Sequence, residues 1–191
     1  TSYVIMLVIS YLIDIISGIF LIGYIIQNLK IMCNQPFFIS DIFYGFKNHT
    51  NKIISLRFII LSIELIGSLP FLFFSYFVQQ DPTYPLIAAT VLSIIPAIGV
   101  SIWMELEFSM SYYLLVDFPD YELKELLRTS RSLMKENRGR LLSLMVSFLP
   151  LYLLGFLSFG IGNLWVSSYF RMSLTEFYMD LISRKNASKS E

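Results

Sequence analysis

Long apolar runs are the feature that most restricts how this chain can fold. Residues 3–29 form an almost unbroken series of Ile, Leu, Val, Tyr and Phe. As an α-helix such a run reaches about 40 Å, more than the ~30 Å hydrocarbon core of a bilayer. The chain is 55% hydrophobic, whereas soluble domains are roughly 45–50% apolar. The sequence therefore predicts an all-α fold class, a polytopic membrane helix bundle.

Four further apolar runs follow the first, and polar connectors separate them. We expect five transmembrane helices within a single domain over residues 1–185, and we expect residues 186–191 to be a disordered tail. The expected spans are residues 3–29, 53–78, 85–107, 141–157 and 161–182.

Three segments beside these runs carry apolar residues at helical spacing. Residues 40–46 and 120–136 are expected to be interfacial amphipathic helices. The third span is expected to continue as an amphipathic helix to Val116. Its apolar stripe comprises Trp103, Leu106, Met110 and Tyr113, and another face carries Glu105, Ser109 and Tyr112.

Basic residues occur in every second connector, and this pattern predicts the orientation of the chain in the membrane. The turns 79–85 and 158–162 contain none. The other connectors and the chain end carry Lys30, Lys47, Lys52 and Arg57, six Lys or Arg between Asp117 and Arg140, and then Arg184, Lys185 and Lys189. By the positive-inside rule the basic connectors, their interfacial helices and the C-terminus are cytoplasmic, and Thr1 is outside. Because Thr1 follows no signal sequence, we expect a sixth helix before it.

Several function classes lack the residues that they require. Formal net charge is zero, from 14 Lys+Arg and 14 Asp+Glu, so no basic field indicates nucleic acid. His49 is the only histidine and Cys33 the only cysteine, which leaves no nucleophile and base pair and no spacing typical of a metal site. No hydrolase, zinc-protease or phosphate-loop motif occurs. We expect no enzyme, no cofactor and no metal.

Acidic residues at membrane depth are the first candidate functional residues. Asp14 lies near the middle of the first run and Glu64 lies within the second. A charged side chain at a helix centre costs roughly 2.5–3.5 kcal/mol, so such residues are functional candidates. One interpretation is a proton or cation relay, with Glu105 and Glu107 at its inner mouth. The other is pairing within the bundle, where Arg57 neutralises Glu64 and Arg171 neutralises Glu105 or Glu107.

Basic residues at the ends of the spans are the second group of candidates. They are Lys47, Lys52, Arg131, Lys135, Arg138 and Arg140. Each is able to contribute about 1 kcal/mol to binding of anionic headgroups near the surface. Anchoring of the topology is an equally good interpretation, and the two roles do not exclude each other.

Short sequences along most of the chain carry a family resemblance. They are residues 41–47 (DIFYGFK), residues 133–140 (LMKENRGR), residues 144–148, Gly160-Ile161-Gly162, Leu164-Trp165-Val166 and Phe177-Tyr178. With these the chain resembles the bacterial integral membrane family catalogued as domain of unknown function 975. It departs at Glu136, where the family tends to have Gly, and at residues 167–169, where the family tends to have a Pro before the Tyr. The resemblance implies a bacterial plasma-membrane protein and carries no activity or catalytic residues.

Two functions remain open at this point. The first is a non-enzymatic scaffold or accessory subunit that contacts lipid, a membrane protein partner or a second copy of itself. The alternative is a small permease or ion-coupled transporter that uses the intramembrane acidic residues. Nothing in the sequence names a substrate.

Overall fold

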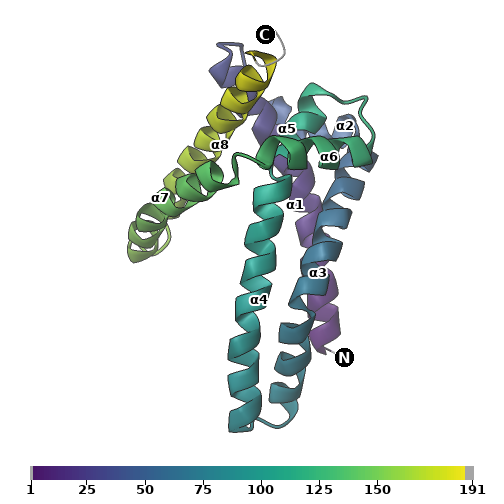
Figure 1. Ribbon diagram of the computed structural model, residues 1–191, viewed down its shortest axis with the longest axis vertical. Helices are drawn as coiled ribbons and strands as arrows, with labels where there is room; N and C mark the ends of the chain where they lie inside the picture. The colour runs from purple at the N-terminus through teal and green to yellow at the C-terminus, as the bar shows by residue number, and fades with distance from the viewer. Residues whose placement is uncertain (1, 188–191) are drawn as a thin grey trace.

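The computed structural model describes residues 2–187 of the chain, and within these residues every regular element is helical (Figure 1). Four long helices follow the expected apolar runs, and their bounds differ from the expected ones by a few residues. In chain order the elements are α1 (Ser2–Met32), η1 (Ile39–Phe43), α2 (Tyr44–Lys47), α3 (Thr50–Gln80), α4 (Tyr84–Phe108), α5 (Met110–Asp117), α6 (Leu123–Met134), α7 (Arg138–Leu157) and α8 (Gly162–Ala187).

The long helices alternate in direction, and this places all the basic connectors together. Figure 1 shows α3 and α4 as one antiparallel hairpin with α1 beside it, and α7 and α8 as a second hairpin that diverges from the first. Connectors 33–49 and 118–137 lie at one end of the molecule together with the C-terminal end of α8. We call this end the basic end. The turns 81–83 and 158–161, which lack basic residues, lie away from it.

Four helical stretches are long and apolar enough to cross a membrane, by length and composition. They are Ile5–Met32, Thr50–Gln80, Tyr84–Asp117 and Arg138–Leu157. Helix α8 occupies the position of the fifth expected span but is not among them, because charged residues follow its apolar start from Arg171 onward. The expected count of five is therefore not confirmed. The fold is an all-helical one with four candidate membrane-spanning helices.

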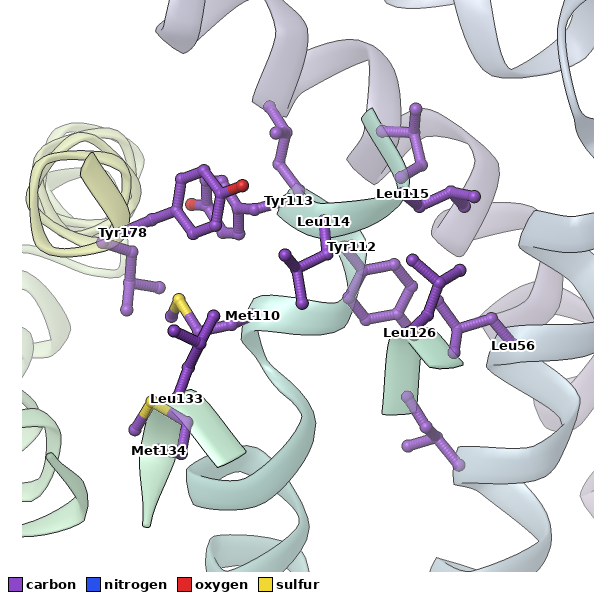
Figure 2. Packing of buried hydrophobic residues seen from close by; sticks show 14 of the residues in the cluster. Leu56, Met110, Tyr112, Tyr113, Leu114, Leu115, Leu126, Leu133, Met134 and Tyr178 are labelled. Atoms are coloured by element: carbon purple, nitrogen blue, oxygen red, sulfur yellow. The ribbon is translucent and has the colours of Figure 1, made fainter. Parts of the chain in front are cut away.

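The buried core is concentrated near the basic end. Figure 2 shows side chains from α3, α5, α6 and α8 meeting there. Leu56, Met110 and Leu126 are completely buried, and the rings of Tyr113 and Tyr178 stack with their centroids 4.9 Å apart. In the candidate spans, by contrast, only 6–17% of the most apolar stretch is buried within the fold. The helices thus share a core at one end, and α3 and α4 also pack along each other, while the apolar sides of the spans are largely uncovered.

A bend between α4 and α5 divides the helix that we expected to continue to Val116. Ser109 lies at the bend with φ −55° and ψ −35°, and its N–H still donates to the carbonyl of Glu105 at 3.1 Å. The backbone therefore stays helical through the change of direction. This bend places α5 in the core rather than at the surface, since residues 110–115 are all buried.

The first connector packs against α1. The expected helix over residues 40–46 is a 3-10 helix, η1, followed by the single turn α2. Asp41 accepts a hydrogen bond from Lys30 Nζ at 2.8 Å and another from the Phe38 N–H at 2.9 Å. The hydrogen bond from Lys30 is the main cause that lowers the pKa of Asp41 below its usual value, so the carboxylate stays charged.

The second expected interfacial helix, residues 120–136, is α6, and it crosses the end of α4 (Figure 1). A membrane-surface location of α6 or of η1 is not confirmed. Asn186 and Ala187, which were expected in the disordered tail, belong to α8. Residues 188–191 lie outside the described residues.

Gly23 allows α1 and η1 to approach closely. A Cβ added at Gly23 lies 2.1 Å from the backbone oxygen of Ile42, whereas a Cβ at Gly99 of α4 meets nothing within 4 Å. We expect Gly23→Ala to lower the free energy of unfolding by about 1–3 kcal/mol, because backbone must move. The matched control Gly99→Ala is expected to be neutral or slightly stabilising. Thermal denaturation in detergent measures both, and equal midpoints for the two variants would contradict the packing described.

Candidate functional site

Glu107, near the end of α4, has a fully buried side chain that forms ion pairs with two partly exposed arginines. Its side chain has 0% exposure, and its carboxylate lies 3.1 Å from Arg131 Nε of α6. A second ion pair joins it to Arg138, the first residue of α7. Ser130 Oγ also donates to the Glu107 backbone carbonyl at 2.8 Å. Because removing a carboxylate from water costs several kcal/mol unless it is paired, this cluster ties α4 to α6 and α7.

A second group of charged side chains lines a polar cavity of about 340 Å³. Helices α1, α3, α4, α5 and α8 enclose it, and it lies toward the basic end. The residues on its wall with acidic or basic side chains are Asp14, Arg57, Glu105 and Arg171. Two acidic and two basic side chains thus face one space, which has the size of a small-molecule site.

The ion pair in this cavity is looser than the one at Glu107. Arg57 Nη2 lies 3.5 Å from Asp14 Oδ1, and the Asp14 side chain is 52% exposed. Glu105 shares the cavity wall with Arg171 and Arg57. The Arg171 guanidinium also lies over the ring of Tyr24, 5.7 Å from its centroid. These charges are close together without being fully paired.

Glu64 lies beside the cavity rather than on its wall. It is half-buried on α3, two turns after Arg57. The charges of Arg57 and Asp14 act on it. The structure thus brings Asp14, Glu105 and Arg171 together as lining residues, keeps Glu64 within electrostatic reach, and separates Glu107 from all of them.

Five polar lining residues were not among the sequence-based candidates: Ser17, Arg57, Ser109, Tyr112 and Tyr113. The spacing of Glu105, Ser109 and Tyr112 already placed them on one helical face, and that face lines the cavity. The sequence predicted Arg57 as a basic residue beside the first connector and as a partner for Glu64. Its contact with Asp14 crosses from α3 to α1, and no local pattern predicts such a contact.

Most of the candidate headgroup residues have partners inside the fold. Lys52 Nζ donates to the carbonyls of Pro119 and Tyr121 at 2.5 and 3.2 Å. Arg140 forms a 2.6 Å ion pair with Asp180, and Arg131 and Arg138 hold Glu107. Lys47 and Lys135 are exposed and form no ion pair with the residues that the structure describes.

Comparison with known proteins identifies the family of this chain but assigns it no activity. The family model described as protein of unknown function (DUF975) matches residues 1–185. The chain belongs to the DUF975 family. No curated protein and no solved structure matches it. Membership of DUF975 thus agrees with the resemblance seen in the sequence, and any functional argument depends on the geometry above.

A mutant cycle tests whether the buried Glu107 carboxylate of this DUF975 member depends on its two arginine partners. Replacing both partners, Arg131→Gln and Arg138→Gln, leaves a buried charge unpaired and is expected to cost about 3–5 kcal/mol of unfolding free energy. Glu107→Gln alone should cost less, because the arginine side chains are 63% and 39% exposed and are able to turn to solvent.

Adding Glu107→Gln to the double arginine variant should therefore restore part of the lost stability. Denaturation in detergent measures each variant. The surface-pair variant Arg184→Gln is the control, with an expected loss below about 1 kcal/mol. A triple variant no more stable than the double variant would show that Glu107 is not charged or not buried.

Proposed function

We propose that this chain is a non-enzymatic scaffold or accessory subunit of the bacterial plasma membrane, with its C-terminus in the cytoplasm. The gathering of the basic connectors at one end supports the orientation, because positively charged connectors remain on the cytoplasmic side. In this proposal α8 completes a five-helix arrangement as a tilted span, and α6 lies in the cytoplasmic interface with its charged face toward water.

The single observation that carries the scaffold role is where the packing lies. The described helices bury a core near the basic end and leave the apolar sides of the spans largely uncovered. The most deeply buried carboxylate, that of Glu107, holds helices together. Such a construction suits a protein that presents helices to lipid, to a membrane protein partner or to a second copy of itself.

Exposed basic residues at the same end support contact with anionic headgroups. Lys47 and Lys135 have no ion-pair partner among the described residues, and Arg131 is mostly exposed despite its contact with Glu107. Each such charge near an anionic surface contributes about 1 kcal/mol. Lys52 is assigned instead to holding the connector before α6.

A small permease or ion-coupled transporter is the second candidate, and the polar cavity favours it. Asp14, Glu105 and Arg171 line the cavity and Glu64 lies beside it. Intramembrane ionisable residues mark ion pathways in many transporters. The cavity lies toward the basic end. A transporter would therefore also need a path from the cavity to the opposite side of the membrane.

Purified protein in sealed vesicles separates the two functions. The scaffold role predicts that wild-type vesicles show no more proton-dependent uptake or acidification than empty vesicles, and that Asp14→Asn and Glu64→Gln change neither. Size-exclusion profiles establish that each variant is folded. A proton-dependent flux in wild-type vesicles that either substitution abolishes in a folded protein would make the transporter role correct and the scaffold role wrong.

A further inference from the structure

The polar cavity places exposed charge inside a segment that crosses the membrane. Asp14 lies within the candidate span Ile5–Met32, and half of its side chain is exposed. Glu105 and Arg171 are exposed as well. Asp14 has Arg57 as an ion-pair partner at 3.5 Å, but hydrocarbon offers no hydrogen bonds to the exposed parts of these charged side chains. Something polar must therefore occupy the space that these side chains face.

A buried hydroxyl on the cavity wall also lacks a partner. Ser109 lines the cavity and is 93% buried, its exposure being 7%, and its Oγ has no hydrogen-bond partner among the described residues. Since more than nine in ten buried polar groups are hydrogen-bonded in folded proteins, this hydroxyl points to an occupant that offers a hydrogen bond.

The charges on the wall indicate what kind of occupant fits. The wall carries Asp14 and Glu105, which attract a cation, and Arg57 and Arg171, which attract an oxyanion. A ligand with a single charge would compensate one pair and oppose the other. A ligand that carries both charges is able to pair with both kinds of group, and this pairing offsets the cost of removing its two charges from water.

We propose that this cavity binds a zwitterionic group, with an ammonium against Asp14 and Glu105 and an oxyanion against Arg57 and Arg171. Ser109 Oγ supplies a further hydrogen bond. The site does not depend on the scaffold role, because binding requires no transport and no partner protein. Two sources offer this chemistry: the headgroup of phosphatidylethanolamine and a free amino acid.

The surroundings of the cavity are compatible with a lipid as the source. A neighbouring groove shares Ser17, Leu21 and Arg171 with the cavity and adds Phe20 and Tyr24 of α1. A polar space that continues into an apolar groove is able to receive a headgroup and the start of an acyl chain. A free amino acid would use the polar space alone.

Thermal unfolding of the full chain in detergent, with added probe, tests the proposal. The probes are phosphatidylethanolamine, phosphatidylglycerol and glycine. We expect a saturable rise of the midpoint with phosphatidylethanolamine or with glycine, since a ligand that binds only the folded state stabilises it. Arg171→Gln, Asp14→Asn and Ser109→Ala should each weaken the effect. For the two charge variants we expect at least about tenfold weaker binding, because they remove charge-assisted hydrogen bonds.

Matched controls lie outside the cavity on the same helices. Arg184→Gln on α8 and Ser101→Ala on α4 should leave probe binding unchanged, since Arg184 pairs with Asp180 and Ser101 Oγ bonds to Ala97. A response to phosphatidylethanolamine alone identifies a lipid headgroup, and a response to glycine identifies a free solute. Both support the proposal.

Three results would overturn it. If neither zwitterionic probe shifts the wild-type midpoint, the cavity holds only water. If phosphatidylglycerol acts as strongly as phosphatidylethanolamine and Asp14→Asn has no effect, the site binds an anion and not a zwitterion. If the cavity variants respond like the wild type, the probe binds elsewhere. The probe comparison on wild-type protein decides the first case even where a variant fails to fold.

Discussion

The ion pairs of Glu107 are the interaction on which the arrangement at the basic end depends. A carboxylate without access to water must be matched by nearby positive charge, and here the matching charges come from α6 and from the first residue of α7. This requirement holds α6 across the end of α4 and fixes where α7 begins. Since α7 and α8 form one hairpin, it also determines where α8 and its Arg171 lie.

The cavity follows from the same arrangement. Arg171 from α8, Arg57 from α3 and Asp14 from α1 face one space only because these helices meet near the basic end. The bend at Ser109 contributes as well, since it turns α5 into the core and sets Tyr112 on the cavity wall. The Glu107 ion pairs and the charges of the cavity thus form two neighbouring clusters that differ in burial and in pairing. The Glu107 carboxylate is buried and closely paired with two arginines, whereas the cavity is open and its charges are incompletely paired.

Apolar periodicity and run length predicted the helices well, because both are local properties of the chain. The four candidate spans, the helix over residues 123–134 and the α8 hairpin all lie where the pattern placed them. The count of five spans was not confirmed. Helix α8 is apolar at its start and charged beyond it, so composition alone does not identify it as a membrane span. The bend after Phe108 was also missed, since no proline or glycine marks it.

The sites were harder to predict, because they depend on contacts between distant segments. Glu105 and Glu107 stand two residues apart and so project from different sides of one helix. One faces the cavity and the other faces α6 and α7. Sequence spacing alone placed both at one inner mouth. Likewise, the basic residues before α7 looked alike in the sequence, yet Arg138 and Arg140 pair with acidic residues on different helices.

The central claim is that all basic connectors lie on the cytoplasmic side of a membrane that the apolar helices cross. Labelling of single cysteines in intact cells with a membrane-impermeant reagent tests it most directly. Cys33 is the only native cysteine and is exposed in the first connector, and Asp81→Cys in a Cys33→Ser background reports on the exposed turn before α4. The account predicts labelling of Cys33 only after permeabilisation and labelling of Asp81→Cys in intact cells. Labelling of both positions from the same side would contradict it.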